Sequence, residues 1–321
     1  MRNLLKMAAA AAVMFAGLQT GAHAQDLEKV DVAIGQGGKW DASLPAMGVK
    51  KGIFEKHGLE LNFVYTQGGG ETQQIIISGS ADIGFSVGTQ GTLGAYAKGA
   101  PIRVLGSVAN GDDAFYFVRA DSPIQSMDDL KGGTLAFSRN GSSTHSFALG
   151  FVNLLGVDAV PTATGGPPST ITSVMSGQVD VGWSAPPFGL DLLQEGKIRQ
   201  IASSRDLPNV KDHTVRLIIT NVQSVEERPE MIKSFMDAYR ETIEWAYSTD
   251  EALEMYAEMQ NISVDIARMV REEFDTREYI NPDVLLGIDD LMKEAVEFKY
   301  IDAPLTDEQL NELVLIEGWE R

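Results

Sequence analysis

Thr134-Leu-Ala-Phe-Ser-Arg-Asn-Gly-Ser-Ser-Thr-His-Ser-Phe-Ala-Leu-Gly-Phe-Val-Asn-Leu-Leu-Gly156 places a small polar turn between two apolar segments. Residues 135–137 are typical of a short buried strand, and the apolar residues within 147–155 predict a helix that ends at Gly156. The turn, residues 140–144, would expose backbone N–H groups at the positive end of the helix dipole, which suits an anionic or polar ligand. An ordinary Ser or Thr cap explains the same residues, so the turn alone does not decide the function.

The architecture of this stretch occurs twice in the chain. Ile77-Ser-Gly-Ser-Ala-Asp-Ile-Gly-Phe-Ser86 aligns with Met175-Ser-Gly-Gln-Val-Asp-Val-Gly-Trp-Ser184 at a constant offset of 98 residues. Strands and helices alternate in both copies, which predicts two α/β lobes, each with a mostly parallel sheet. Ligands of such sheets lie beyond the carboxyl ends of the strands, so we expect the strand-exit loops of the two lobes to face each other across one cleft.

Two extended apolar stretches, residues 115–118 and 215–219, predict the chain crossings between the lobes. They divide the mature chain into lobe 1 (residues 25–114 and 216–321) and lobe 2 (residues 115–215). Beyond Thr220 the pattern becomes helical, with a capping box expected at residues 224–227, and this tail is predicted to pack around lobe 1. Its helices are expected in a first amphipathic segment after Pro229 and then at 250–260, 263–275, 282–298 and 306–316.

The first 24 residues have the form of a secretory signal peptide. Arg2 and Lys6 precede an apolar run at 7–18, and Ala22-His-Ala24 is a cleavage site. The apolar run is too short to span a bilayer. We therefore expect an exported, soluble, periplasmic protein that begins near Gln25.

Composition narrows the possible partners. The 26 basic and 45 acidic residues give a net charge of −19, which becomes −21 without Arg2 and Lys6. That balance argues against nucleic acid and anionic membrane surfaces, although local N–H groups can still hold a small anion. The chain contains no cysteine, which excludes a lipid-anchored cysteine, disulfides and thiol catalysis. We expect a monomer that is not inserted in a membrane.

Several segments together resemble the periplasmic substrate-binding proteins of ABC importers in the nitrate/sulfonate/taurine and NMT1/THI5-like group. They are Met47-Gly-Val-Lys-Lys-Gly-Ile-Phe-Glu-Lys-His-Gly-Leu59, Ser78-Gly-Ser-Ala-Asp-Ile-Gly84, Lys98-Gly-Ala-Pro101, and Ser126-Met-Asp-Asp-Leu-Lys-Gly132 followed by Gly141-Ser-Ser-Thr144. The resemblance implies a type II periplasmic-binding-protein fold that closes on a small-molecule solute without a cofactor and delivers it to a membrane permease. Desulfinases on this scaffold use a cysteine nucleophile, and the related pyrimidine synthases carry a cysteine-rich motif. Because this chain has neither, the resemblance favours binding over catalysis.

The strand-exit loops supply the candidate ligand-binding residues. Backbone N–H groups and hydroxyls would hold a charged head, and aromatic rings from opposite lobes would pack against a flat body. Arg139 and Arg216 each act either as a carboxylate clamp or in a surface or hinge ion pair. The candidate contacts are Gln36, Trp40, Ser86, Thr89, Gln90, Asn140, Gly141, Ser142, Ser143, Thr144, His145, Trp183 and Phe188.

Other chemistries are less well supported by these residues. Residues 84–88 match G-x-S-x-G, but the repeat copy at 182–186 loses the last glycine, so the match indicates lobe architecture more than a hydrolase. The glycine-rich loops lack a P-loop pattern, and the three histidines of the mature chain are too scattered to predict a metal site.

The sequence therefore predicts a binding protein for a small organic anion of the sulfonate or aromatic carboxylate type. Three alternatives remain open: a lyase with His145 as base, a carrier of a thiamine pyrimidine precursor, and a sensory binding protein.

Overall fold

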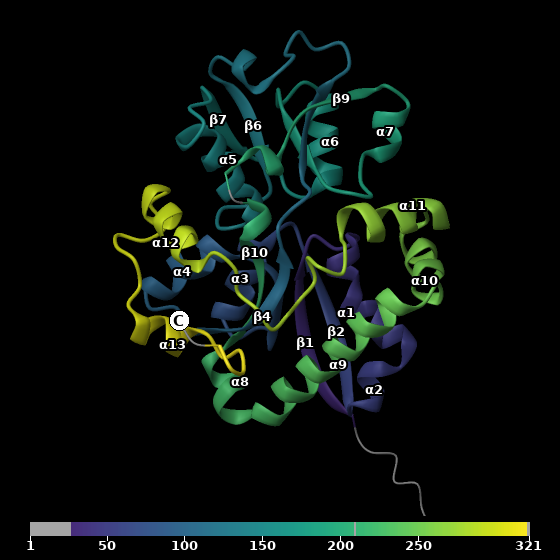
Figure 1. The fold of residues 1–321 in the computed structure, drawn as a ribbon, viewed down its shortest axis with the longest axis vertical. Helices are drawn as coiled ribbons and strands as arrows, with labels where there is room; N and C mark the ends of the chain where they lie inside the picture. Colours follow the sequence, from purple (N-terminus) through teal and green to yellow (C-terminus); the bar gives the residue numbers. More distant parts are fainter. Residues whose placement is uncertain (1–26, 209, 320–321) are drawn as a thin grey trace, which may run out of the picture.

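The chain folds into two α/β lobes, one above the other in Figure 1. This computed structural model describes residues 27–208 and 210–319. The predicted signal peptide, residues 1–24, lies outside the described residues. Within them, no helix is both long and apolar enough to cross a membrane.

Lobe 1 contains a five-stranded mixed sheet. Its strand order is β2-β1-β3-β10-β4, in which β1 pairs in parallel with β2 and β3, and β10 is antiparallel to β3 and β4. The apolar alternation after Lys29 forms β1, as expected, and both faces of the sheet are covered. The strands are β1 (Glu28–Gly35), β2 (Leu59–Thr66), β3 (Ile83–Gly88), β4 (Ile102–Asn110) and β10 (Thr214–Asn221).

Lobe 2 repeats this strand order. Parallel β6-β7 and antiparallel β8-β5-β9 are joined by a parallel bridge between Leu135 and Val181. The resulting sequence of strands, β7-β6-β8-β5-β9, matches that of lobe 1 one for one, so the predicted doubly repeated α/β fold is confirmed. The strands are β5 (Phe115–Arg119), β6 (Gly133–Phe137), β7 (Ala159–Ala163), β8 (Gly182–Ser184) and β9 (Ile198–Ser203).

Each chain crossing ends in a strand of the lobe that it enters. β5 follows β4 of lobe 1 and lies between β8 and β9, while β10 follows β9 of lobe 2 and lies between β3 and β4. β10 begins at Thr214, two residues before the predicted start of the second lobe 1 segment. The lobe boundaries themselves stay a prediction.

In both lobes most helices begin after a strand-exit loop; α2 instead follows α1 directly. The helix predicted up to Gly156 ends earlier, at Asn153, although Gly156 does adopt a left-handed conformation with φ of 71°. The helices before the tail are α1 (Trp40–Lys51), α2 (Ile53–Lys56), α3 (Gly69–Ile77) and α4 (Thr89–Ala97) in lobe 1, with α5 (Ser143–Asn153), α6 (Pro167–Met175) and α7 (Leu190–Gln194) in lobe 2.

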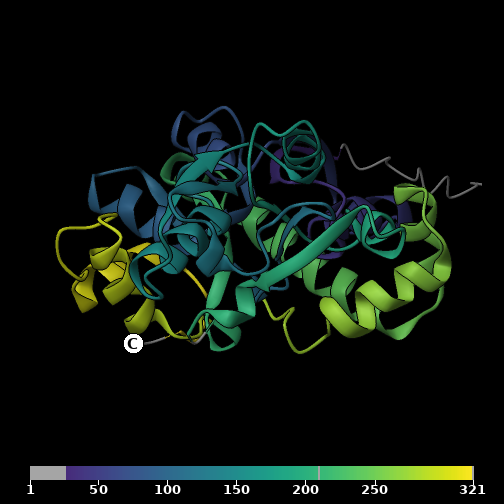
Figure 2. The ribbon, with the colours of Figure 1, turned by 90° about the horizontal axis from the view of Figure 1, so that it is seen from above.

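The helical tail wraps lobe 1 on two sides, as Figures 1 and 2 show. α9 buries its apolar stripe, including Phe235 and Tyr239, against one face of the sheet, while α12 and α13 pack on the opposite face. The tail also reaches lobe 2, which the sequence did not predict. The tail helices are α8 (Val222–Glu227), α9 (Pro229–Ser248), α10 (Glu251–Gln260), α11 (Val264–Met269), α12 (Ile288–Glu297) and α13 (Asp307–Leu313).

Two details of the tail differ from expectation. The capping box predicted at Ser224 is wrong, because Asn221 caps α8 by accepting the Ser224 N–H at 2.8 Å. α12 begins at Ile288 instead of near Pro282, because the preceding backbone bonds to lobe 1 strands: the Pro282 carbonyl accepts the Ser107 N–H at 3.1 Å. Backbone groups used in this way cannot also form helix.

Candidate functional site

A cavity of about 590 Å³ lies between the two lobes, and we call it the cleft cavity. Lobe 1 lines it with residues 36–38 and 65–67, and lobe 2 with residues 166–169 and Phe188. The tail adds the end of α10. Because all three parts of the fold contribute, the shape of the cavity depends on how the lobes are closed.

The lining is polar but uncharged. Side-chain amides come from Gln36, Gln67 and Gln260, and hydroxyls include that of Ser43, while the lining residues include no Lys, Arg, His, Asp or Glu. Gln67 also joins the lobes, since its Oε1 accepts the Gly166 N–H at 3.4 Å. Such groups can hydrogen-bond a polar head from either side of the cleft.

The loop after β1 is pressed between two aromatic rings. A Cβ atom at Gly37 would lie 2.5 Å from the Tyr65 ring, and one at Gly38 would lie 2.5 Å from Cζ of Phe188. Only glycine allows these approaches, and Gln36 itself has a left-handed φ of 59°. Of the predicted contacts, Gln36 and Phe188 therefore line the cleft cavity, although ligand contact by either stays a prediction.

The polar turn at residues 140–144 contacts lobe 1 directly and does not line the cleft cavity. A Cβ atom at Gly88 would lie 2.6 Å from the Ser143 nitrogen, and one at Gly91 would lie 2.7 Å from the Gly141 carbonyl carbon. Gly70 would likewise approach the Asn140 carbonyl carbon to 3.0 Å. The strand-exit loops of the two lobes do face each other, as predicted. Their backbones are in direct contact, however, so the lobes are closed at this point.

The hydroxyls predicted to hold an anion already have partners within the chain. Thr144 accepts the Ser138 N–H at 2.9 Å, and the Ser142 side chain caps α5. Thr89 donates to the Thr214 carbonyl at 2.5 Å. The remaining predicted hydroxyls, Ser86 and Ser143, are also buried.

His145 joins lobe 2 to the tail. Its Nδ1 lies 2.5 Å from the Tyr300 hydroxyl and also accepts the Gly141 N–H at 3.3 Å. Burial lowers the pKa of His145 to about 4, so the ring is neutral at ordinary pH. A neutral ring with Nδ1 as acceptor fits both bonds, and these contacts give His145 a packing role between lobe 2 and the tail.

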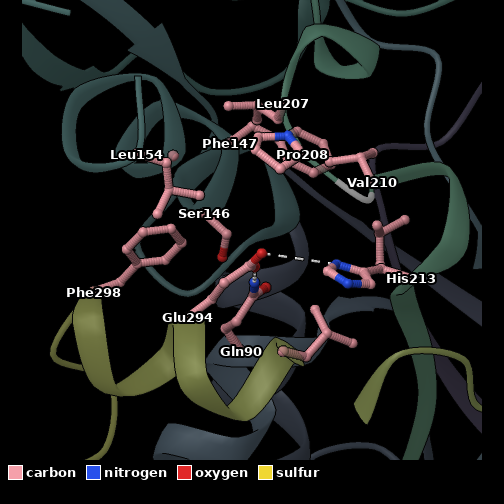
Figure 3. Close-up of a pocket in the computed structure, with 13 residues that line it drawn as sticks. Gln90, Ser146, Phe147, Leu154, Leu207, Pro208, Val210, His213, Glu294 and Phe298 are labelled. Atoms are coloured by element: carbon pink, nitrogen blue, oxygen red, sulfur yellow. Dashed lines mark hydrogen bonds and ion pairs between the residues drawn. The ribbon is translucent and has the colours of Figure 1, made fainter. Parts of the chain in front are cut away.

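Figure 3 shows a much smaller pocket, of about 20 Å³, where α12 meets lobe 2. Gln90 donates to Glu294 at 2.9 Å, and Nδ1 of His213 lies 3.9 Å from the same carboxylate. Burial raises the pKa of Glu294 to about 7, while the bond from Gln90 acts in the opposite direction. A pocket of this volume holds about one water molecule, so we interpret it as a packing contact between α12 and lobe 2. The predicted ligand residue Gln90 therefore lies here and not in the cleft cavity.

The two tryptophans predicted to sandwich a ligand lie in the cores. Trp40 has no exposed surface: its ring packs edge-on against Tyr256 at 5.0 Å, and its Nε1 donates to the Tyr247 hydroxyl at 3.0 Å. Trp183 is buried in the lobe 2 core. The prediction of a tryptophan sandwich is wrong, because both rings turn from the loops toward their own lobe. Tyr65 and Phe188, from opposite lobes, flank the cavity instead.

A buried ion cluster at the crossings was not predicted. Arg216, on the second crossing, pairs with Asp41 of α1 at 2.7 Å and with Asp112, which lies just before the first crossing. Beside it, Lys39 pairs with Asp113 at 3.3 Å. Of the two roles left open for Arg216, the structure shows the hinge ion pair. The sequence held one signal, the adjacent Asp112 and Asp113 between two apolar strands.

The charges of the cluster are not balanced, because the carboxyl groups of Asp41, Asp112 and Asp113 outnumber the two cations, Lys39 and Arg216. Burial would raise the pKa of Asp41, but the Lys39 and Arg216 charges hold it below its usual range. Burial instead raises the pKa of Asp113 and, together with the Asp113 charge, that of the nearby Asp275. One oxygen of each of these two carboxyls has no hydrogen-bond partner among the described residues. Among all the residues that the structure describes, no group of three or more His, Cys, Asp or Glu could hold a metal ion.

Comparison with known proteins identifies the family. The model of the family described as NMT1/THI5 like matches residues 46–252. The chain belongs to this family. A search of curated protein sequences finds no significant match.

Solved structures share the fold. The alkanesulfonate-binding protein SsuA from Xanthomonas axonopodis pv. citri, bound to MOPS, has a TM-score of 0.69 and 18% identity, covering 91% of this chain and 98% of its own. The periplasmic nitrate-binding protein NrtA from Synechocystis PCC 6803 has a TM-score of 0.69 and 14% identity, covering 91% and 87%. The desulfurization enzyme DSZB has a TM-score of 0.61 and 16% identity, covering 90% and 97%. This family member therefore has the periplasmic-binding-protein fold.

Proposed function

We propose that the protein is the periplasmic solute-binding component of an ABC importer and captures a small organic anion in the cleft cavity. The observation that carries the proposal is a 590 Å³ cavity lined by both lobes and the tail, between lobes that already touch. Its size lies within the range of small-molecule sites, about 300–1,000 Å³. Hinge closure would bury the solute. The closed protein, a monomer, would then deliver the solute to a membrane permease.

Arg139 supports the anionic class. Its guanidinium donates to the Ser138 carbonyl at 3.2 Å and has no ion-pair partner among the described residues. Arg139 is not one of the residues that line the cavity, but a Cβ atom at Gly68 would lie 3.6 Å from its Cγ atom, and Gly68 is adjacent to Gln67 of the lining. We propose that a sulfonate or aromatic carboxylate takes its charge-assisted bond from Arg139 and its remaining bonds from the amides of the lining. Tyr65 and Phe188, which line the cavity, would offer aromatic surface to its apolar part.

An enzyme with His145 as base has less support. The ring lies outside the cleft cavity, its Nδ1 is engaged by Tyr300 and Gly141, and its lowered pKa of about 4 makes it a weak base. A flat pyrimidine in the cleft cavity remains a second solute for the same site and belongs in the test panel.

The test begins with native mass spectrometry of protein purified from its own host, to detect bound solute. Calorimetry with sulfonates, aromatic carboxylates and pyrimidines follows. Arg139→Gln should weaken binding of the anions roughly 10- to 150-fold and leave neutral solutes unchanged. Arg119→Gln, which removes an exposed lobe 2 arginine paired with Asp121, is the matched control and should have no effect. No co-purified solute together with no response to any compound would refute the proposal.

A further inference from the structure

The tail also holds lobe 2 at a place outside the cleft cavity. Glu294 and Phe298 of α12 line the small pocket of Figure 3, which Phe147 and Leu154 of α5 line from lobe 2. The residues that line this pocket are all different from those that line the cleft cavity. We call the tail segment at residues 291–300 the latch.

The contact between the latch and lobe 2 belongs to the closed form. Tyr300 is fixed to lobe 1, because a Cβ atom at Gly94 of α4 would lie 2.9 Å from its carbonyl oxygen. Its hydroxyl partner at 2.5 Å, His145, moves with the polar turn of lobe 2, since the same Nδ1 accepts the Gly141 N–H. An opening that separates this turn from lobe 1 therefore also separates Tyr300 from His145.

Closure buries His145 in its neutral form. The ring lies against Phe137 of β6, with ring centroids 4.4 Å apart, and the titratable group that faces it is Tyr300. Burial lowers the pKa of His145 from an ordinary 6.5 to about 4. In an open form the ring regains water, so closing expels a proton from His145 when the pH lies between about 4 and 6.5.

Closure buries Glu294 in its protonated form. Burial raises its pKa from an ordinary 4.5 to about 7, the Asp290 and Glu297 charges on α12 add to this, and the bond from Gln90 of α4 acts in the opposite direction. Burial also lowers the pKa of His213, 3.9 Å away, so that ring supplies no positive charge at neutral pH. Opening withdraws the lobe 2 residues that cover Glu294, so closing adds a proton to it between about pH 4.5 and 7.

We propose that the two latch groups exchange protons in opposite directions when the lobes close, so that solute capture is insensitive to acidity. His145 loses a proton as Glu294 gains one, and the two changes cancel between about pH 4.5 and 6.5, where both groups titrate. The inference rests on the proposed function and concerns how the same binding event responds to pH.

Calorimetry with ethanesulfonate tests the proposal, because a sulfonate stays ionised throughout this pH range. The wild-type affinity should change by less than about threefold between pH 4.5 and 6.5. His145→Gln keeps an acceptor for Tyr300 but cannot titrate, so binding should tighten by up to about tenfold per unit as pH falls from 7 to 4.5. Glu294→Gln should have the opposite slope, with binding weakened by up to about tenfold per unit as pH falls from 6.5 to 4.

The matched controls lie in lobe 1 and its tail, outside the latch. His57→Gln, at the end of α2, and Glu308→Gln, an exposed position of α13, should both keep the wild-type curve. Asp113 and Asp275 are present in every one of these proteins, so differences between the curves belong to the latch.

Tyr300→Phe tests the contact itself at a single pH. Loss of the hydroxyl should weaken ethanesulfonate binding about 2- to 12-fold at pH 7. Tyr96→Phe removes a hydroxyl that bonds to Glu312 within lobe 1, and it should bind like wild type. Thermal melts identify any variant that does not fold.

Parallel pH curves for wild type and both latch variants, or slopes of the same sign, would overturn this inference and leave the proposed function intact. If no sulfonate binds, the proposed anionic class fails separately. The distance between spin labels on Val64→Cys and Val160→Cys in the free protein then replaces affinity. As pH falls, it should shorten in His145→Gln and lengthen in Glu294→Gln, and unchanged distances in both would overturn the inference.

Discussion

Replacement of Gly91 by alanine tests whether the lobes close as described. A Cβ atom at this position would collide with the Gly141 carbonyl oxygen and lie 2.7 Å from the carbonyl carbon, whereas ordinary contact begins at 3.4 Å, so the lobe 2 turn must move by clearly more than about 0.7 Å. The obstacle is backbone and cannot rotate away. Overpacking of this kind costs about 1–3 kcal/mol, and the cost falls only on the closed form. We therefore expect Gly91→Ala to weaken solute binding roughly 5- to 150-fold.

The folded open form should not suffer, because Gly91 has ordinary helical geometry in α4 and alanine is the better helix former by up to about 1 kcal/mol. The assay is the distance between spin labels on Val64→Cys and Val160→Cys, which are 48% and 53% exposed on opposite lobes of a chain without native cysteine. In saturating solute, Gly91→Ala should retain a longer distance than wild type.

Gly48→Ala is the matched control. This helical glycine also lacks room for a Cβ atom, which would lie 2.7 Å from the Phe54 ring, but the clash is within lobe 1. It should lower the melting temperature and leave the distance between lobes unchanged. Wild-type affinity and wild-type distance in Gly91→Ala would refute the reasoning.

Three further substitutions have defined outcomes. Arg216→Met leaves the buried carboxylates of Asp41 and Asp112 without their cation, and should reduce the free energy of unfolding by about 3–5 kcal/mol in urea titrations; an unchanged midpoint would contradict the pairing. Glu294 has a folded pKa of about 7, above its ordinary value of 4.5, so its contribution to stability disappears as pH rises from 4.5 through 7; Glu294→Gln should remove that part of the pH dependence of melting. His145 has a folded pKa of about 4, below its ordinary 6.5, so stability declines as pH falls through this window, and less steeply in His145→Gln.

The fold could be predicted from the sequence because its signals are local. The alternation of strands and helices and the polar turns depend on neighbouring positions, and the offset of 98 residues shows the same local pattern a second time. They were sufficient to predict two repeated lobes and two crossings. The lobe 2 sheet reproduces the strand order of lobe 1, which is what a duplicated pattern should give.

The site was less predictable because burial depends on distant partners. Trp40 follows a strand-exit loop in sequence, yet its indole N–H bonds to Tyr247, 207 positions away. Arg216 finds Asp41 at a separation of 175 positions. Nothing near either residue indicates these contacts. The sequence located the right loops, but packing decided which side chains faced the cleft, and only Gln36 and Phe188 among the candidates line the cavity.

The strand order has a consequence for how the chain reaches its final form during synthesis. All five strands of lobe 2 lie between residues 115 and 203, so that half is complete once this segment has emerged. Lobe 1 lacks the strand between β3 and β4 until residues 214–221 arrive, and its outer layers come later still. We therefore expect lobe 1 to finish folding after lobe 2, although its first segment is synthesised earlier. The edges of β3 and β4 stay unpaired until β10, more than a hundred residues downstream, has been made.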